Sequence, residues 1–286
     1  MQIRAISKVV SDLGEGPIWN PDTNEVTWVD ITGKKVHQSQ FDSGLTRTFE
    51  LLTSPGCIVE KREGGYLAGT SEGFANISID GELTPMHSFL DATMRFNDGK
   101  VDAAGRFWAS SLALDFSADR GSLYVVDVDG TYRQVLNRLT LPNGLGWSPD
   151  STSFYFIDSV PGVLKRFDFD VNTGEVSNPI VLINFDSGNG IPDGMTVSTN
   201  GFIVVAIWDG FRLEIYSPNG KKVEEIKLPI QRPTSCTFAG LDGTTLIVTS
   251  AAQDLDLIAQ PLSGKILAIS DTGLSGLPSR KFGLIT

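Results

Sequence analysis

Short apolar segments recur along this chain, each following a polar turn that contains Gly, Pro or Asn. The six clearest segments begin at Val26, Tyr66, Phe107, Phe154, Phe202 and Leu246. Their spacing of about 40 to 50 residues is the length of one four-stranded propeller blade. A repeat of this kind buries its apolar face only against its neighbours. The repetition therefore predicts an all-β fold, a six-bladed β-propeller with four-stranded blades that forms a single domain over residues 1–286.

Composition and turn chemistry favour the same fold. The chain has 30 Gly and 14 Pro among 286 residues, and no stretch keeps a helical period over three turns. Asp80-Gly81, Asp129-Gly130 and Asn219-Gly220 are typical hairpin-turn dipeptides between predicted strands. Residues 3–10 alternate like a strand, and we expect this N-terminal strand to close the ring by pairing with the last unit. Two β-sandwiches are the alternative, but they do not predict six evenly spaced units.

Charge and cysteine content exclude several classes of function. A formal net charge of −11 argues against nucleic-acid and anionic-membrane partners, since both require a concentrated basic surface. The two cysteines, Cys57 and Cys236, have no paired spacing, so we expect buried free thiols rather than disulfides or a thiolate zinc site. No signal segment or membrane-spanning apolar run is evident, and we expect a cytoplasmic protein.

Polar residues occupy one repeated position, the start of the first strand of a blade. Four of the six starts carry one: Glu15, Asn97, Asn143 and Asp193. Equivalent positions in a closed ring converge on its axis, and oxygen ligands suit Ca²⁺, Mg²⁺ or Mn²⁺ and tolerate Zn²⁺. Each Asn-Gly or Asp-Gly alone is a common turn, but their coincidence favours an ion site formed by Glu15, Asn143 and Asp193. Simple alternation along the strand predicts that Asp98 points away from the channel.

Several motifs resemble those of the regucalcin (senescence marker protein), gluconolactonase and luciferin-regenerating-enzyme family. The resemblance extends over nearly the whole chain, from Leu13-Gly14-Glu15-Gly16-Pro17 to residues 261–266. Its most specific motif is Arg95-Phe96-Asn97-Asp98-Gly99-Lys100-Val101-Asp102, and the others are Pro142-Asn143-Gly144-Leu145, Ile157-Asp158-Ser159, Pro192-Asp193-Gly194-Met195 and Thr234-Ser235-Cys236.

The resemblance implies a site and an activity. Members of the family are six-bladed propellers that hydrolyse aldonolactones with one divalent metal ion. Carried over motif by motif, it implies that Glu15, Asn143 and Asp193 bind this ion, whose identity (Ca, Zn, Mn or Mg) stays open. It also implies that Arg95 and Asn97 contact the sugar, with Asn97 an occasional or water-mediated ligand of the ion. Asp115 falls where the family has a substrate-binding Glu.

The expected reaction is metal-dependent hydrolysis of a sugar lactone to the aldonic acid, in which metal-bound water attacks the lactone carbonyl. Asp193 is the expected base, because the histidines, His37 and His87, fall on predicted outer strands or loops where we expect surface residues. The alternatives are a metal-dependent hydrolase of other lactones, esters or organophosphates, and a non-enzymatic calcium-binding regulatory propeller. The expected partner is a small-molecule sugar lactone, and the oligomeric state, monomer or weak dimer, stays open.

Overall fold

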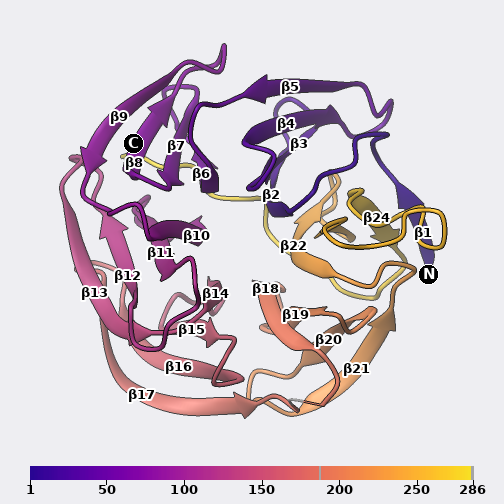
Figure 1. The fold of residues 1–286 in the computed structure, drawn as a ribbon. Coiled ribbons are helices and arrows are strands. Elements are labelled where there is room, and N and C mark those ends of the chain that lie inside the picture. Colours follow the sequence, from indigo (N-terminus) through magenta and orange to yellow (C-terminus); the bar gives the residue numbers. More distant parts are fainter. Residues whose placement is uncertain (187, 285–286) are drawn as a thin grey trace.

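The fold is a ring of six antiparallel sheets around a central axis (Figure 1). The computed structural model describes residues 1–186 and 188–284, and these residues contain 24 strands in six four-stranded sheets. In five sheets the strand order follows the chain, from the innermost strand to the outermost. The prediction of a six-bladed β-propeller is confirmed.

The first three blades share this order. Blade 1 comprises β2 (Gly14–Asn20), β3 (Glu25–Asp30), β4 (Lys35–Gln40) and β5 (Thr46–Glu50). Blade 2 comprises β6 (Pro55–Glu60), β7 (Tyr66–Thr70), β8 (Gly73–Ile77) and β9 (Leu83–Ser88). Blade 3 comprises β10 (Met94–Val101), β11 (Phe107–Ala113), β12 (Gly121–Val126) and β13 (Tyr132–Leu139).

The last three blades complete the ring. Blade 4 comprises β14 (Pro142–Trp147), β15 (Ser153–Asp158), β16 (Val163–Asp170) and β17 (Glu175–Asn184). Blade 5 comprises β18 (Ile191–Val197), β19 (Ile203–Trp208), β20 (Arg212–Tyr216) and β21 (Lys222–Lys227). Blade 6 comprises β22 (Pro233–Ala239), β23 (Thr245–Ser250), β24 (Leu267–Ser270) and the N-terminal strand β1 (Gln2–Ala5).

The N-terminal strand closes the ring as expected. β1 pairs antiparallel with β24, so the outermost strand of blade 6 comes from the start of the chain. The strand ends at Ala5 rather than near Val10, because the chain turns there toward blade 1. Ser7 marks this turn, since its hydroxyl lies 2.7 Å from that of Thr46 in β5. Closure therefore joins blade 6 to blade 1 through side chains as well as through the sheet.

Small residues allow the first strands to approach one another at the axis. A Cβ atom on Gly56 would lie 2.1 Å from the carbonyl oxygen of Phe96 in the next blade. A Cβ atom on Gly194 would lie 2.2 Å from the hydroxyl of Ser235 in blade 6. Both distances are far shorter than any van der Waals contact, so only glycine fits at these two positions. Apolar clusters between neighbouring sheets form the core further out.

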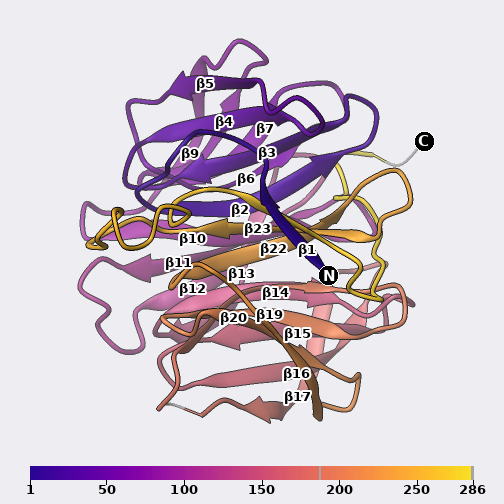
Figure 2. The same cartoon turned by 90° about the vertical axis from the view of Figure 1, so that its right-hand side faces the viewer.

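Every first strand has a register shift near its start. The shifts fall at Glu15/Ile18, Pro55/Cys57, Phe96/Gly99, Pro142/Leu145, Pro192/Met195 and Pro233/Ser235. A bulge of this kind interrupts the ladder and re-aims the side chains beside it. In the side view the strands run roughly along the ring axis, so the six bulges lie toward one end of the channel (Figure 2).

The C-terminal strap (residues 275–283) crosses the other end of the channel. It starts near blade 5, where the amide of Thr199 donates to the carbonyl of Ser275 at 2.8 Å. It ends beside blades 2 and 3, where the amide of Phe282 donates to the carbonyl of Glu60 at 2.8 Å. The strap thus connects blades that are far apart in sequence, and no sequence pattern predicts it.

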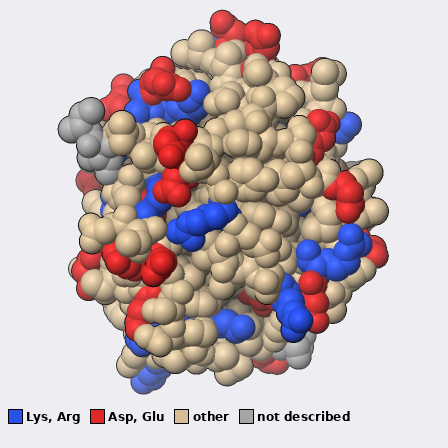
Figure 3. Space-filling model, turned by 90° about the vertical axis from the view of Figure 1, so that its left-hand side faces the viewer, with Lys and Arg blue, Asp and Glu red and all other residues tan. Residues whose placement is uncertain are grey.

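The structure also shows where charged residues and the two cysteines lie. Lys and Arg are interspersed with Asp and Glu on the face shown in Figure 3. Cys57 and Cys236 are buried and free, as expected. Within residues 1–186 and 188–284 there is no helix long and apolar enough to cross a membrane.

Candidate functional site

Four of the predicted site residues converge at the start of the inner strands. Glu15 lies on β2, Asn97 on β10, Asn143 on β14 and Asp193 on β18, and their exposed fractions are only 6–8%. Each residue lies within or beside the register shift of its strand. β10 contacts both β14 and, across the axis, β2. Positions as far apart in sequence as Glu15 and Asn97 therefore lie on neighbouring strands at the axis.

A chain of hydrogen bonds connects blades 3, 4 and 5. Arg95 Nη1 donates to Asn97 Oδ1 at 2.7 Å, and Asn97 Nδ2 donates to Asn143 Oδ1 at 2.6 Å. Asn143 Nδ2 donates to Ser159 Oγ at 2.8 Å, and this hydroxyl donates to the carbonyl of Pro192 at 2.6 Å. The chain fixes the amide of Asn143 with its nitrogen toward Ser159 and its oxygen toward Asn97.

Ser159 is a functional candidate that no local sequence pattern predicts. It follows the last residue of β15, is 3% exposed, and links the peptide before Asp193 to the side chain of Asn143. The only sequence signal was its place in the motif Ile157-Asp158-Ser159. Its contacts join separate blades, and no local pattern indicates such a connection.

The two carboxylates lie in an environment that disfavours their charge. Burial, followed by the charge of Asp98, raises the pKa of Glu15 to about 8. Burial and then the charges of Glu15 and Asp98 raise the pKa of Asp193 well above its usual range. Burial lowers the pKa of Arg95 to about 10, although Glu15 and Asp193 oppose this effect. The three groups thus form one electrostatic cluster.

Asp98 belongs to this cluster, contrary to the expectation from alternation. It is 3% exposed and raises the pKa of both Glu15 and Asp193, so it acts on the channel carboxylates. Alternation fails here because Asn97 and Asp98 both fall inside the register shift between Phe96 and Gly99. Its Oδ1 accepts from the amide of Gly99 at 2.7 Å, as expected for a residue that supports the turn.

The donor set fits a hard divalent cation. Neither Glu15 nor Asp193 forms an ion pair within the described residues, although both are buried. Buried carboxylates without an ion-pair partner are costly, and a cation is the usual compensation. The described residues contain no cluster of three or more His, Cys, Asp or Glu suited to a metal. With the amide oxygen of Asn143, the two carboxylates make up the all-oxygen donor set that the sequence predicts for an ion.

Asp115 lies apart from this cluster. It is exposed in the loop after β11, and its carboxylate accepts from the amide of Ser117 at 3.0 Å. Hydrogen bonding to the side chain of Ser117, followed by the bond to its amide, lowers the pKa of Asp115. No contact joins Asp115 to Arg95 or Asn97 within the described residues, so its substrate role stays a prediction.

The histidines are remote from the candidate site, but one is not a surface residue. His37 lies on β4, is only 3% exposed, and packs against Trp28 with the rings tilted and their centroids 5.0 Å apart. The expectation of a surface position was wrong for His37, because β4 is covered on that face by the aromatic core of the blade. Burial lowers its pKa to about 4. His87 is half-buried on the outermost strand β9.

The chain matches known proteins over almost its entire length. Residues 13–252 match the model of the SMP-30/Gluconolactonase/LRE-like region. Regucalcin from Danio rerio is 35% identical over 289 residues, which cover 97% of this chain and 97% of the relative.

Solved structures agree in fold along the whole chain. A calcium-binding protein, regucalcin, from Agrobacterium tumefaciens str. C58 superposes with a TM-score of 0.93 at 25% identity and covers 99% of this chain and 98% of its own. A luciferin-regenerating enzyme superposes with a TM-score of 0.92, also at 25% identity, covering 99% of both chains. The chain belongs to the SMP-30/gluconolactonase/LRE-like family.

Proposed function

We propose that this protein hydrolyses a sugar (aldono) lactone to the corresponding aldonic acid with the help of one divalent cation. Glu15, Asn143 and Asp193 would hold the cation, and Arg95 and Asn97 would position the sugar. The observation that carries the proposal is the pair of buried, unpaired carboxylates beside an Asn amide and an Arg with unused donors.

Family membership and relatives support the coarser part of this proposal. The family is named for gluconolactonase, and its regucalcin members are relatives of this chain, which supports a lactonase-type or a regulatory role. One structural neighbour is a calcium-binding protein, which supports a divalent metal ion. The finer assignment of substrate and residues rests on the chemistry of the cluster.

Arg95 is suited to hold substrate hydroxyl groups. Its Nη1 donates to Asn97 Oδ1 and to the carbonyl of Phe96, at 2.7 and 2.9 Å. Nε and Nη2 form no hydrogen bond with any described residue, so they are free to donate to a sugar. Two fixed donors on one planar group orient a polyhydroxylated ring better than a mobile ammonium does.

Asp193 is the group best placed to accept a proton. Hydrolysis requires water to lose a proton as it attacks the lactone carbonyl, and the buried carboxylate of Asp193 is a group that can accept it. Ser159 and Asn143 hold the neighbouring peptide and amide in place. A divalent cation at this position would supply Lewis-acid stabilisation of the developing negative charge and lower the pKa of water.

The proposal is tested by lactone hydrolysis with the full-length protein. Gluconolactone and a panel of other aldono-1,4- and 1,5-lactones would be assayed after chelator treatment and after reloading with single divalent ions. We expect turnover that chelator removes and one or more ions restore. Equal turnover with and without ions, at the rate of the uncatalysed reaction, would overturn the proposal.

A calcium-binding regulatory role is the second candidate, favoured by the all-oxygen donor set and by the regucalcin relatives. Calorimetric titration with Ca²⁺ separates the two. Tight Ca²⁺ binding without turnover of any lactone would favour the regulatory role. Turnover of phosphotriesters alone would instead point to a hydrolase with a different substrate.

A further inference from the structure

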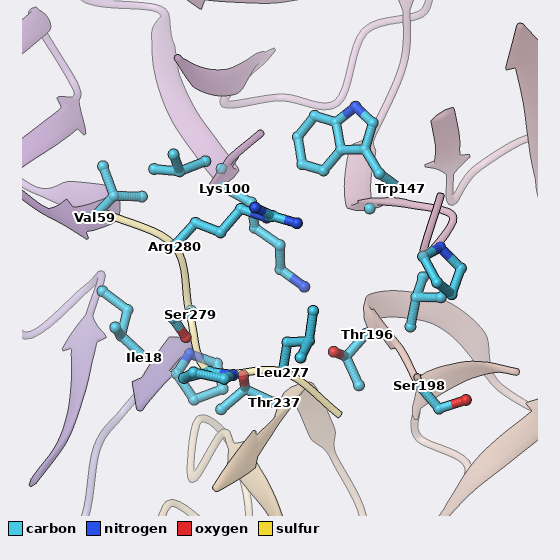
Figure 4. A pocket seen from close by; sticks show the side chains of 18 of the residues that line it. Ile18, Val59, Lys100, Trp147, Thr196, Ser198, Thr237, Leu277, Ser279 and Arg280 are labelled. Atoms are coloured by element: carbon cyan, nitrogen blue, oxygen red, sulfur yellow. The ribbon is translucent and has the colours of Figure 1, made fainter. Parts of the chain in front are cut away.

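A cavity lies in the channel, at the end away from the carboxylates. Its volume is about 150 Å³, and its walls come from the later parts of the inner strands and from residues 277–280 of the C-terminal strap. Ile18 and Val59 lie on one side of it and Trp147 on another (Figure 4). Glu15, Asn143 and Asp193 are not among the lining residues. The cavity is therefore distinct from the candidate catalytic site.

The charge of this cavity is unusual for so acidic a protein. Lys100 on β10 and Arg280 on the strap both extend into it, and its lining includes no Asp or Glu (Figure 4). Neither side chain forms an ion pair within the part of the chain that the structure describes. By contrast, the next residue, Lys281, pairs with Asp22 at 2.9 Å. Two basic side chains thus share one cavity whose lining holds no carboxylate, although the charge of Lys100 also opposes the rise in pKa of Asp98 and Glu15.

Hydroxyl groups add uncharged donors to the same space. Thr196 and Thr237 line the cavity, and their hydroxyls form no hydrogen bond with the described residues. Lys100 Nζ donates to the carbonyl of Met195, which holds the ammonium group in place. The cavity therefore offers an ammonium, a guanidinium and two hydroxyls.

The strap supplies one half of this arrangement and is firmly attached. The hydroxyl of Ser279 accepts from the amide of Trp19 at 3.1 Å, and Lys281 pairs with Asp22. Phe282 forms backbone hydrogen bonds with Glu60 and Arg62 in blade 2. These contacts on both sides of Arg280 hold its backbone across the end of the channel. The cavity is thus assembled from the inner strands of all six blades and from the C-terminal strap.

We propose that this cavity binds a small tetrahedral oxyanion of the phosphate class. A phosphate group presents several acceptor oxygens in a compact volume, and guanidinium and ammonium groups are its usual partners in proteins. Arg280 can donate two hydrogen bonds from one plane, while Lys100 and the threonine hydroxyls contact the remaining oxygens. The carboxylate of an aldonic acid shares part of this chemistry but is planar and has two oxygens.

Calorimetric titration of the full-length protein tests this, with inorganic phosphate, glycerol phosphate and gluconate as separate probes at constant ionic strength. We expect saturable binding of phosphate or its monoester, weakened about tenfold or more in Arg280→Met because a bidentate charged contact is lost. Lys221→Gln, which removes an exposed charge in the turn between β20 and β21, is the matched control and should bind as the wild type does.

Three results would overturn the proposal. They are no saturable binding of either phosphate compound, equal binding by wild type and Arg280→Met, or binding of gluconate alone. Lys100→Met provides a second variant, and thermal melting of each protein establishes that it is folded. Because the readout is binding rather than turnover, this proposal fails or stands independently of the proposed lactonase activity.

Discussion

Ser159 offers a sharp test of how the candidate metal site is organised. Its hydroxyl accepts from Asn143 Nδ2 at 2.8 Å and donates to the carbonyl of Pro192 at 2.6 Å. The first contact sets which end of the Asn143 amide faces Asn97, and the second holds the peptide that precedes Asp193. Replacing Ser159 by Ala removes both contacts while leaving all three expected ligands in the chain.

The size of the effect follows from these contacts. Each buried hydrogen bond contributes about 0.5–1.5 kcal/mol, so Ser159→Ala should lower the free energy of unfolding by about 1–3 kcal/mol. The effect on metal affinity should be more pronounced than the effect on stability, because loss of a residue that orients a metal ligand typically lowers metal affinity by about 10–100-fold. Ser159→Thr keeps a hydroxyl and should recover most of the affinity.

Ser250→Ala is the matched control for this variant. Ser250 is 1% exposed and its hydroxyl donates to the carbonyl of Lys265 at 2.8 Å, but it hydrogen-bonds none of the expected ligands. Titration with Ca²⁺ and Mn²⁺ and thermal melting would be measured for wild type, Ser159→Ala, Ser159→Thr and Ser250→Ala. A similar loss of stability in both alanine variants, with unchanged metal affinity in both, would refute the positioning role of Ser159.

Three further predictions follow from other parts of the structure. Asp193→Asn should reduce lactone turnover at least about 100-fold, and near-full activity would exclude Asp193 as the base. Thermal melting of the metal-free protein should show equal or higher stability, since burial that raises the pKa of this carboxyl opposes folding. Gly56→Ala should lower the Tm by about 2–8 °C, because its Cβ would meet the Phe96 carbonyl; an unchanged Tm would contradict this packing account. Burial lowers the pKa of His37 to about 4, so the folded protein resists its protonation and loses stability as the pH falls from about 6.5 toward 4. His37→Gln should reduce that loss of stability by about 2 kcal/mol. This is somewhat less than about 1.4 kcal/mol for each pKa unit would give, because solvent screens part of the effect. Denaturant titrations of wild type and variant at pH 7 and pH 4.5 would measure the difference.

The architecture was predictable because its signals are local. Turn dipeptides such as Asp129-Gly130 and the recurring apolar segments each depend on a few adjacent residues, and their spacing gave the number of blades. The convergence of Glu15, Asn143 and Asp193 followed from ring geometry, since equivalent positions of a closed repeat meet at the axis. The C-terminal strap was not predictable, because its hydrogen bonds to Glu60 and Thr199 join segments with no shared pattern.

The detailed arrangement of the site depends on a β-bulge, which the periodic pattern of the sequence does not indicate. A bulge breaks the two-residue period of a strand, so the orientation of Asp98 could not be obtained by alternation. The link from Asn143 through Ser159 to blade 5 likewise requires three separate strands in register. The burial of His37 depends on Trp28 in the adjacent strand.

The distribution of charge along the channel is itself an argument for function. At one end Glu15, Asp98 and Asp193 are buried together, and the basic groups that lower the pKa of Glu15 are Arg95 and Lys100. Burying three carboxylates so close costs stability that an apolar or amide side chain would not, and folding alone gives no reason to keep them. A bound divalent cation would favour the ionised forms of these carboxylates and would add two positive charges to the cluster. The same cluster that costs stability in folding would then favour the negative charge that develops on a lactone carbonyl.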